Sequence, residues 1–128
     1  MTAASSAPTP TPIFGKTYDL MKWLIPLTLK FPRQQRFVIA AAIQQGTQVF
    51  QLRLFEAQRS AQPSTRLIHA DVALAQLRTQ LRLAHDWELI SAGQFEHGAR
   101  LMDEIGRLLG AWIKTAQKNR ADALRASR

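Results

Sequence analysis

The strongest folding signal in this sequence of 128 residues is an apolar stripe interrupted by two glycines. Between Glu104 and Ile113, large apolar residues recur at spacings of three and four, which places them on one face of an α-helix. Gly106 and Gly110 lie one turn apart within this helix. Because each glycine costs a helix interior about 1 kcal/mol relative to alanine, the pair predicts a surface where another helix approaches closely, within the chain or between copies of it. Two tolerated glycines on a solvated face are the alternative.

The first half of the sequence predicts two helices joined by a sharp corner. The first helix covers residues 17–30, and Pro26 should kink or divide it because proline lacks a backbone N–H donor. The corner is Phe31-Pro32-Arg33, and Pro32 suits the first turn of a second helix that continues to about Ser60. The inner face of this second helix should consist of Ile39, Ile43, Gly46, Phe50 and Leu54.

Two more helices follow a break at residues 61–64. The third ends near residues 87–90 and carries a coiled-coil-like seam made of Leu67, Ala70, Leu74, Leu77, Leu81 and Ala84. Ser91 and Gln94 fit a capping box, so a fourth helix should start there and continue to about Lys118. No segment shows the alternation that is typical of a strand. We therefore expect an all-α, up-down antiparallel four-helix bundle.

The composition predicts where the folded domain begins and ends, and in which cell compartment the protein works. We expect a bundle over residues 16–118, between a disordered tail (1–15) with too little apolar surface to fold and a basic C-terminal tail (119–128). The absence of cysteine excludes disulfides and thiol chemistry. The longest apolar run, Phe37–Ile43, is too short to span a bilayer, and the first residues lack the pattern of a secretion signal. These features predict a soluble, cytoplasmic protein with no membrane partner.

Positive charge is the strongest indication of function. The chain has 17 Lys plus Arg residues against 9 Asp plus Glu, a net charge of +8 that favours contact with nucleic acid. No single helix holds most of this excess, so a binding surface must combine several elements. Eight cations are candidates for phosphate contacts: Lys30, Arg33, Arg36, Arg66, Arg78, Arg82, Lys114 and Lys118. A solvated cation, or one paired across helices, is the alternative at each of these positions.

Local pairing separates these candidates from cations that already have a partner. A carboxylate three or four residues away should engage Arg53 and Arg59 through Glu56, and Arg107 through Asp103 or Glu104. Arg82 also has such a neighbour, Asp86, whereas Arg78 has none within a turn and lies beside the apolar seam. Asp71 of a neighbouring helix or chain could hold Arg78.

The residue pattern gives no positive case for an enzyme. None of His69, His85 and His97 has a second histidine one helical turn away, and no Glu-x-x-His metal motif occurs. The sequence also contains neither a glycine loop that could hold a phosphate nor a nucleophile elbow. We therefore expect no catalytic residue, metal or cofactor. Base-specific recognition is not expected either, because Trp23, Trp87 and Trp112 have core-compatible spacing and should not form exposed aromatic platforms.

Three separated motifs in the sequence resemble those of one known protein family. Gly106-Arg107-Leu108-Leu109-Gly110-Ala111-Trp112-Ile113 resembles the family signature G-R-x-L-G-x-W-I. The segment from Ala70 to Arg82 is similar to the pattern A-D-x-x-L-A-x-L-R-x-x-L-R, and Ile25-Pro26 with Phe31-Pro32-Arg33 resembles the proline-interrupted first helix and its corner. Together these motifs resemble the accessory variability determinant (Avd) proteins of diversity-generating retroelements. The resemblance covers roughly residues 17–118.

The resemblance implies a particular assembly and role. It implies a basic four-helix bundle that forms a barrel-shaped homopentamer, binds template RNA and possibly DNA, and associates with the retroelement reverse transcriptase during mutagenic retrohoming in a bacterium or phage. It also implies that Arg78 and Arg82 are the carried-over basic pair, and that Gly106, Gly110, Trp112 and Asp71 serve helix packing or an oligomer interface. Two alternatives stay open: a bundle protein of the ribosomal RNA intervening-sequence type, and a helical scaffold that binds only protein.

Overall fold

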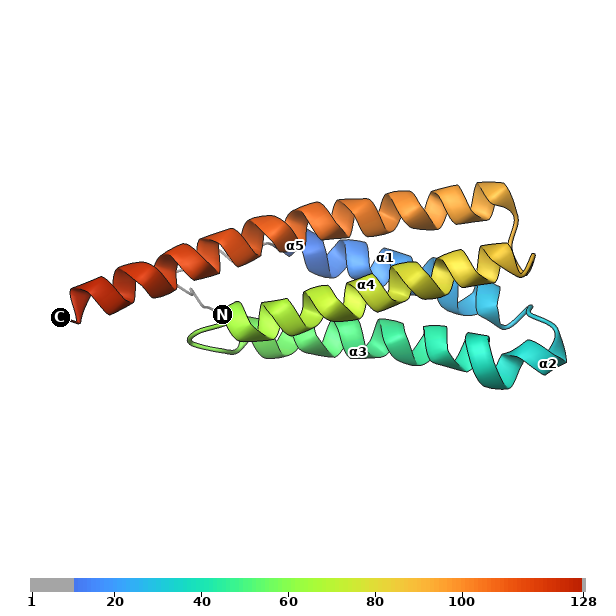
Figure 1. Cartoon of the computed structure of the whole chain (residues 1–128), viewed down its shortest axis with the longest axis horizontal. Coiled ribbons are helices and arrows are strands. Elements are labelled where there is room, and N and C mark those ends of the chain that lie inside the picture. Colours follow the sequence, from blue (N-terminus) through green and yellow to red (C-terminus); the bar gives the residue numbers. More distant parts are fainter. Residues whose placement is uncertain (1–10, 128) are drawn as a thin grey trace.

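Four long helices make up most of the described part of the protein. The computed structural model describes residues 11–127. Its elements are α1 (Thr11–Thr28), a short α2 (Arg33–Gln35), a π-helical turn η1 (Arg36–Ala40), α3 (Ala41–Gln58), α4 (Ser64–Asp86) and α5 (Ala92–Ala126). Figure 1 shows the four long helices side by side along one axis, with successive helices running in opposite directions. The described part of the chain contains no strand, so the predicted all-α, up-down bundle is confirmed.

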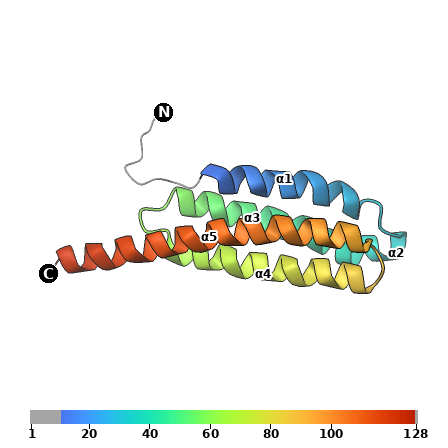
Figure 2. The same cartoon turned by 90° about the horizontal axis from the view of Figure 1, so that it is seen from above.

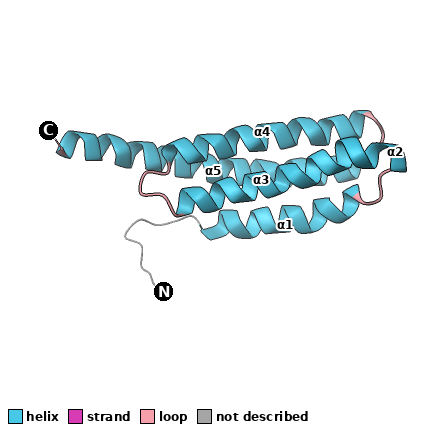
Figure 3. Ribbon diagram, turned by 90° about the horizontal axis from the view of Figure 1, so that it is seen from below, coloured by secondary structure: helices cyan, strands magenta, loops and turns pink. Residues whose placement is uncertain are grey.

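The helices surround a single apolar core. α3 packs against α4 and α1, and α5 packs against α4 and α1, so α1 lies diagonally across the bundle from α4 (Figure 2). Figure 3 shows the same four helices from below, joined by short connections at the two ends. All six residues of the seam predicted for α4 are buried, as are the four large residues predicted for the inner face of the second helix, of which Ile39 lies in η1 and the other three in α3. Periodicity in the sequence therefore located the core correctly.

α1 starts earlier and ends earlier than its sequence indicates. It begins at Thr11, so residues 11–15 of the predicted tail are helical, whereas residues 1–10 lie outside the described part. Ile13 is fully buried and the ring of Phe14 stacks on Phe55 with 5.6 Å between centroids, which supplies the apolar contact that the prediction did not count. At the other end, the helix stops at Thr28, two residues after Pro26.

The corner between α1 and α3 differs from the predicted continuous helix. The chain forms one short helical turn and then η1, where a π-helical turn accommodates an extra residue before α3 begins. The turn buries Ile39 and Ala40 against the core, but it leaves Phe37 and Val38 facing solvent. We refer to residues 29–38 as the corner.

α5 is longer than the bundle that it completes. Its start is confirmed, because Ser91 Oγ accepts from the Gln94 backbone N–H at 3.1 Å and Gln94 Oε1 accepts from the Ser91 backbone N–H at 2.8 Å. The helix has 35 residues, and its last buried residue is Ala116. Residues 117–126 therefore form a helical overhang, visible at the red end in Figure 1, which includes residues 119–126 of the predicted basic tail. A hollow of about 200 Å³ separates the overhang from the start of α4.

Candidate nucleic-acid interface

Arg78, the predicted phosphate ligand nearest the core, is occupied within the chain. Its Nη1 donates to Asp103 Oδ1 at 2.6 Å and its Nη2 donates to the Met102 carbonyl at 3.1 Å, so it joins α4 to α5. Within the chain, the exposed Asp71 does not hold Arg78. A contact between Arg78 and Asp71 of another copy stays a prediction. Sequence spacing could not reveal the true partner, because Asp103 lies 25 residues away on another helix. The Arg78 side chain is 41% exposed, so part of it still reaches solvent.

The two glycines of the α5 stripe have different surroundings. A Cβ on Gly106 would lie 2.6 Å from Nη2 of Arg78, so this glycine makes room for a side chain rather than for the backbone of a second helix. A Cβ on Gly110 would meet nothing within 4 Å. The predicted close helix approach is therefore wrong within the chain for Gly110. Trp112 does serve helix packing, since it is buried and meets Phe14 edge-on at 6.1 Å between centroids.

A second tightly packed glycine of α5, Gly98, is one that the sequence did not single out. A Cβ on Gly98 would lie 2.8 Å from Leu81 Cδ2 and 3.1 Å from the Trp23 ring, so α4 and α1 both press against this point. The sequence around Gly98 gave no signal, because its contacts come from two other helices.

Substitutions at Gly98 and Gly110 should have opposite effects on stability. We expect Gly98→Val to lower the free energy of unfolding by about 1–3 kcal/mol through overpacking. Gly110→Ala should raise it by about 1 kcal/mol, since the site is open and alanine favours the helix. Urea denaturation followed by circular dichroism measures both changes. Destabilisation by Gly110→Ala, together with a smaller mass in solution, would instead show that Gly110 packs against another copy.

Glu104 also has a partner in a different helix. Its Oε2 lies 2.9 Å from Lys16 Nζ, which links α5 to α1. The hydrogen bond and the charge of Lys16 lower the pKa of Glu104, and Glu104 in turn raises the pKa of Lys16. Because Asp103 and Glu104 are engaged by Arg78 and Lys16, the predicted local pairs of Arg107 do not form within the described residues.

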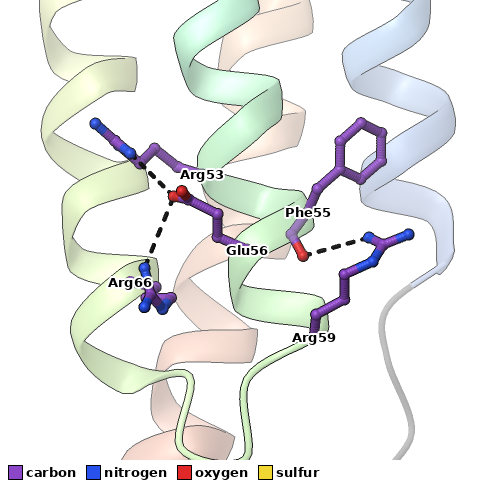
Figure 4. A network of polar contacts seen from close by, with 5 residues as sticks. All are labelled: Arg53, Phe55, Glu56, Arg59 and Arg66. Carbon is purple, nitrogen blue, oxygen red and sulfur yellow. Dashed lines mark hydrogen bonds and ion pairs between the residues drawn. The ribbon is translucent and has the colours of Figure 1, made fainter.

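A third ion-pair cluster joins α3 to α4 near their connection. Figure 4 shows Glu56 between two arginines: its Oε1 lies 2.9 Å from Arg53 Nη1 and 3.9 Å from Arg66 Nη1. Arg66, predicted as a spare cation, is thus near a carboxylate. Arg59 was predicted to share Glu56 but donates to the Phe55 carbonyl at 3.5 Å instead, with its guanidinium over the Phe55 ring. Arg82 lies 4.0 Å from Asp86, as its spacing predicts.

The candidate cations do not form one surface, because they lie at opposite ends of the bundle. Lys30 and Arg33 are exposed in the corner. The C-terminal end of α4, which carries Arg82, lies at the same end of the bundle (Figure 1). Arg66, Lys114 and Lys118 lie toward the other end, where α5 becomes the overhang. Lys30, Arg33, Lys114 and Lys118 have no ion-pair partner among residues 11–127. The Arg36 backbone belongs to the corner, but its side chain lies outside the described part.

Exposed aromatic side chains accompany the cations at the corner end, contrary to the sequence prediction. Phe37 is 82% exposed and Trp87, in the connection between α4 and α5, is 51% exposed. Only Trp112 of the three tryptophans is buried, and Trp23 is half-buried. Helical spacing made Trp87 look like a core residue, but α4 ends at Asp86 and the next residue leaves the seam.

The histidines serve packing where their contacts are defined. His85 stacks on Phe95 and His97 meets Trp23 edge-on, each with 4.7 Å between ring centroids. Over residues 11–127, no three His, Asp or Glu side chains come together in a way that could hold a metal ion. None of the described helices is both long and apolar enough to cross a membrane.

Comparison with solved structures identifies the fold. A protein of unknown function from the S23 ribosomal protein family of Bacteroides thetaiotaomicron has the same fold, with a TM-score of 0.75 and 20% sequence identity. The match covers 82% of this chain and 97% of that one. At this identity the likeness concerns the fold alone. A comparison of the sequence with curated proteins finds no match.

Comparison with protein families agrees with the motifs and the geometry. The profile of the bAvd-like family matches residues 13–116. This range begins at the first buried residue of α1 and ends at the last buried residue of α5, so it contains the whole core and excludes the overhang. The chain therefore belongs to the bAvd-like family.

Proposed function

We propose that this protein is a non-catalytic accessory protein of a diversity-generating retroelement. In this role it binds template RNA, and DNA, by charge and shape, and it associates with the reverse transcriptase to support mutagenic cDNA synthesis in the cytoplasm. Membership of the bAvd-like family carries the proposal. The net charge of +8 and the exposed, unpartnered Lys30, Arg33, Lys114 and Lys118 of the described chain support its nucleic-acid part.

The proposal includes assembly into a homopentameric barrel. Exposed apolar side chains on the outer faces of the bundle, among them Leu52, Ile68 and Val72, would be covered by neighbouring copies. Gly110 and Asp71, both exposed, are available for such contacts, whereas Gly106 and Trp112 are already used inside the chain. Mass measurement in solution, alone and with the cognate reverse transcriptase, tests both the copy number and the association.

The affinity for RNA should depend steeply on salt. Because each neutralised phosphate releases counterions, a plot of log affinity against log salt concentration should be linear, with a slope of about −0.7 to −0.9 per phosphate contact. Fluorescence anisotropy with a labelled RNA measures this slope. Undetectable binding at low salt would reject the nucleic-acid part and favour a scaffold that binds only protein.

A further inference from the structure

We infer that the corner, residues 29–38, is a binding site for unpaired nucleotides of a single strand, with Phe37 stacking on a base while the corner cations contact the flanking phosphates. The inference rests on the proposed nucleic-acid function and adds to it a substrate class and a place on the molecule.

The first observation is the exposure of apolar side chains at one short connection. Phe37 is 82% exposed, Val38 64% and Leu29 60%. Phe37 is the most exposed large apolar residue in the described chain, although the ring of phenylalanine is among the side chains that proteins most often bury. The π-helical turn of η1 is what presents it, and such turns recur at functional sites. An aromatic ring held outward on a defined turn is suited to stacking.

The second observation is the charge around that ring. From Asp19 to Glu56 the sequence contains no other carboxylate but contains five cations: Lys22, Lys30, Arg33, Arg36 and Arg53. Three of them belong to the corner, and neither Lys30 nor Arg33 has an ion-pair partner in the part of the chain that the structure describes. A positive field without local neutralisation attracts polyanions, and it disfavours a basic or neutral protein surface as the occupant.

The combination of ring and cations favours a single strand over a duplex. A duplex presents phosphates to the cations but keeps its bases stacked, so Phe37 would remain unused. A single strand exposes base faces between its phosphates, and every base can stack on an aromatic ring, so recognition needs no particular sequence. This type of binding is compatible with a protein that lacks base-specific hydrogen-bonding contacts.

Two strands and three proteins test the site. The probes are a short single-stranded oligouridine and a strand of the same backbone and length whose central positions lack bases. The wild-type protein should bind the oligouridine about 5- to 150-fold more tightly, the range expected for one base–aromatic stack. Phe37→Leu, which keeps an apolar side chain but removes the ring, should bind both strands alike. Tyr18→Leu is the matched control, because Tyr18 is 61% exposed on α1 outside the corner, and it should keep the wild-type preference.

Each other outcome decides against the site. Equal wild-type affinity for the two strands would overturn the corner site and leave charge-based binding intact. Absence of binding to either strand at low salt would overturn the corner site and the proposed nucleic-acid binding as well. If Phe37→Leu still prefers the oligouridine over the strand that lacks bases, then the bases stack on a side chain other than Phe37. If Phe37→Leu instead changes the mass of the assembly or its binding to the reverse transcriptase, and the base preference stays, then the corner is a protein interface.

Discussion

Replacing Phe50 with alanine should lower the free energy of unfolding by about 3–5 kcal/mol, the largest stability loss that we expect from one substitution. Phe50 is fully buried on α3, in the middle of the core. Its removal costs the transfer energy of the ring and leaves a cavity that the surrounding helices can only partly close. Since domains are stable by about 5–15 kcal/mol in total, the urea midpoint should fall strongly.

Phe37→Ala is the matched control for this experiment. The same side chain is removed from a position that is 82% exposed, so we expect stability to change by no more than about 0.5 kcal/mol. A loss at Phe37 comparable with the loss at Phe50 would contradict the exposure and show that another copy of the chain covers the corner. Together, the two variants test in solution whether Phe50 is buried and Phe37 is exposed.

Removing the three corner cations should lower affinity for single-stranded RNA on the order of 100-fold at about 0.1 M salt, if each makes one phosphate contact. The variant is Lys30→Gln, Arg33→Gln and Arg36→Gln together. Each lost contact should reduce the steepness of the log–log salt plot by about 0.7, so the full change in slope is about 2. Anisotropy titrations at several salt concentrations measure both quantities.

A variant with the same change in net charge serves as the control. Lys114→Gln, Lys118→Gln and Arg120→Gln also remove three charges, but they do so on α5, toward the opposite end of the bundle (Figure 1). We expect a smaller loss of affinity from this variant. Equal losses would indicate that the overall field of the protein, rather than the corner, determines binding, and a larger loss on α5 would move the main contact surface to that end.

The helices were predictable because burial imposes a period on the sequence. The seam of α4 and the inner face of α3 follow from apolar spacing, and the start of α5 follows from the local chemistry of Ser91 and Gln94. The π-helical turn was not predictable, since the apolar spacing of Arg36–Ala40 reads as ordinary helix.

The pairing of charges was predictable only within a helix. Arg53 with Glu56 and Arg82 with Asp86 follow the expected spacing. Arg78 with Asp103 and Lys16 with Glu104 connect different helices, so they depend on the rotation of each helix about its axis, which a single sequence does not fix. The same reason explains Gly98, whose contacts with Leu81 and Trp23 arise from two neighbouring helices.

The overhang of α5 has a mechanical consequence. Ten residues at a rise of about 1.5 Å each project roughly 15 Å past the last buried residue, as a continuation of the helix that the core holds. A short helix without tertiary support is only marginally stable in water, so its outer turns should fray and exchange their amide hydrogens quickly. A molecule that binds the overhang would order those turns. Because the overhang and the core share one continuous helix, a force applied to the overhang would be transmitted to the centre of the bundle.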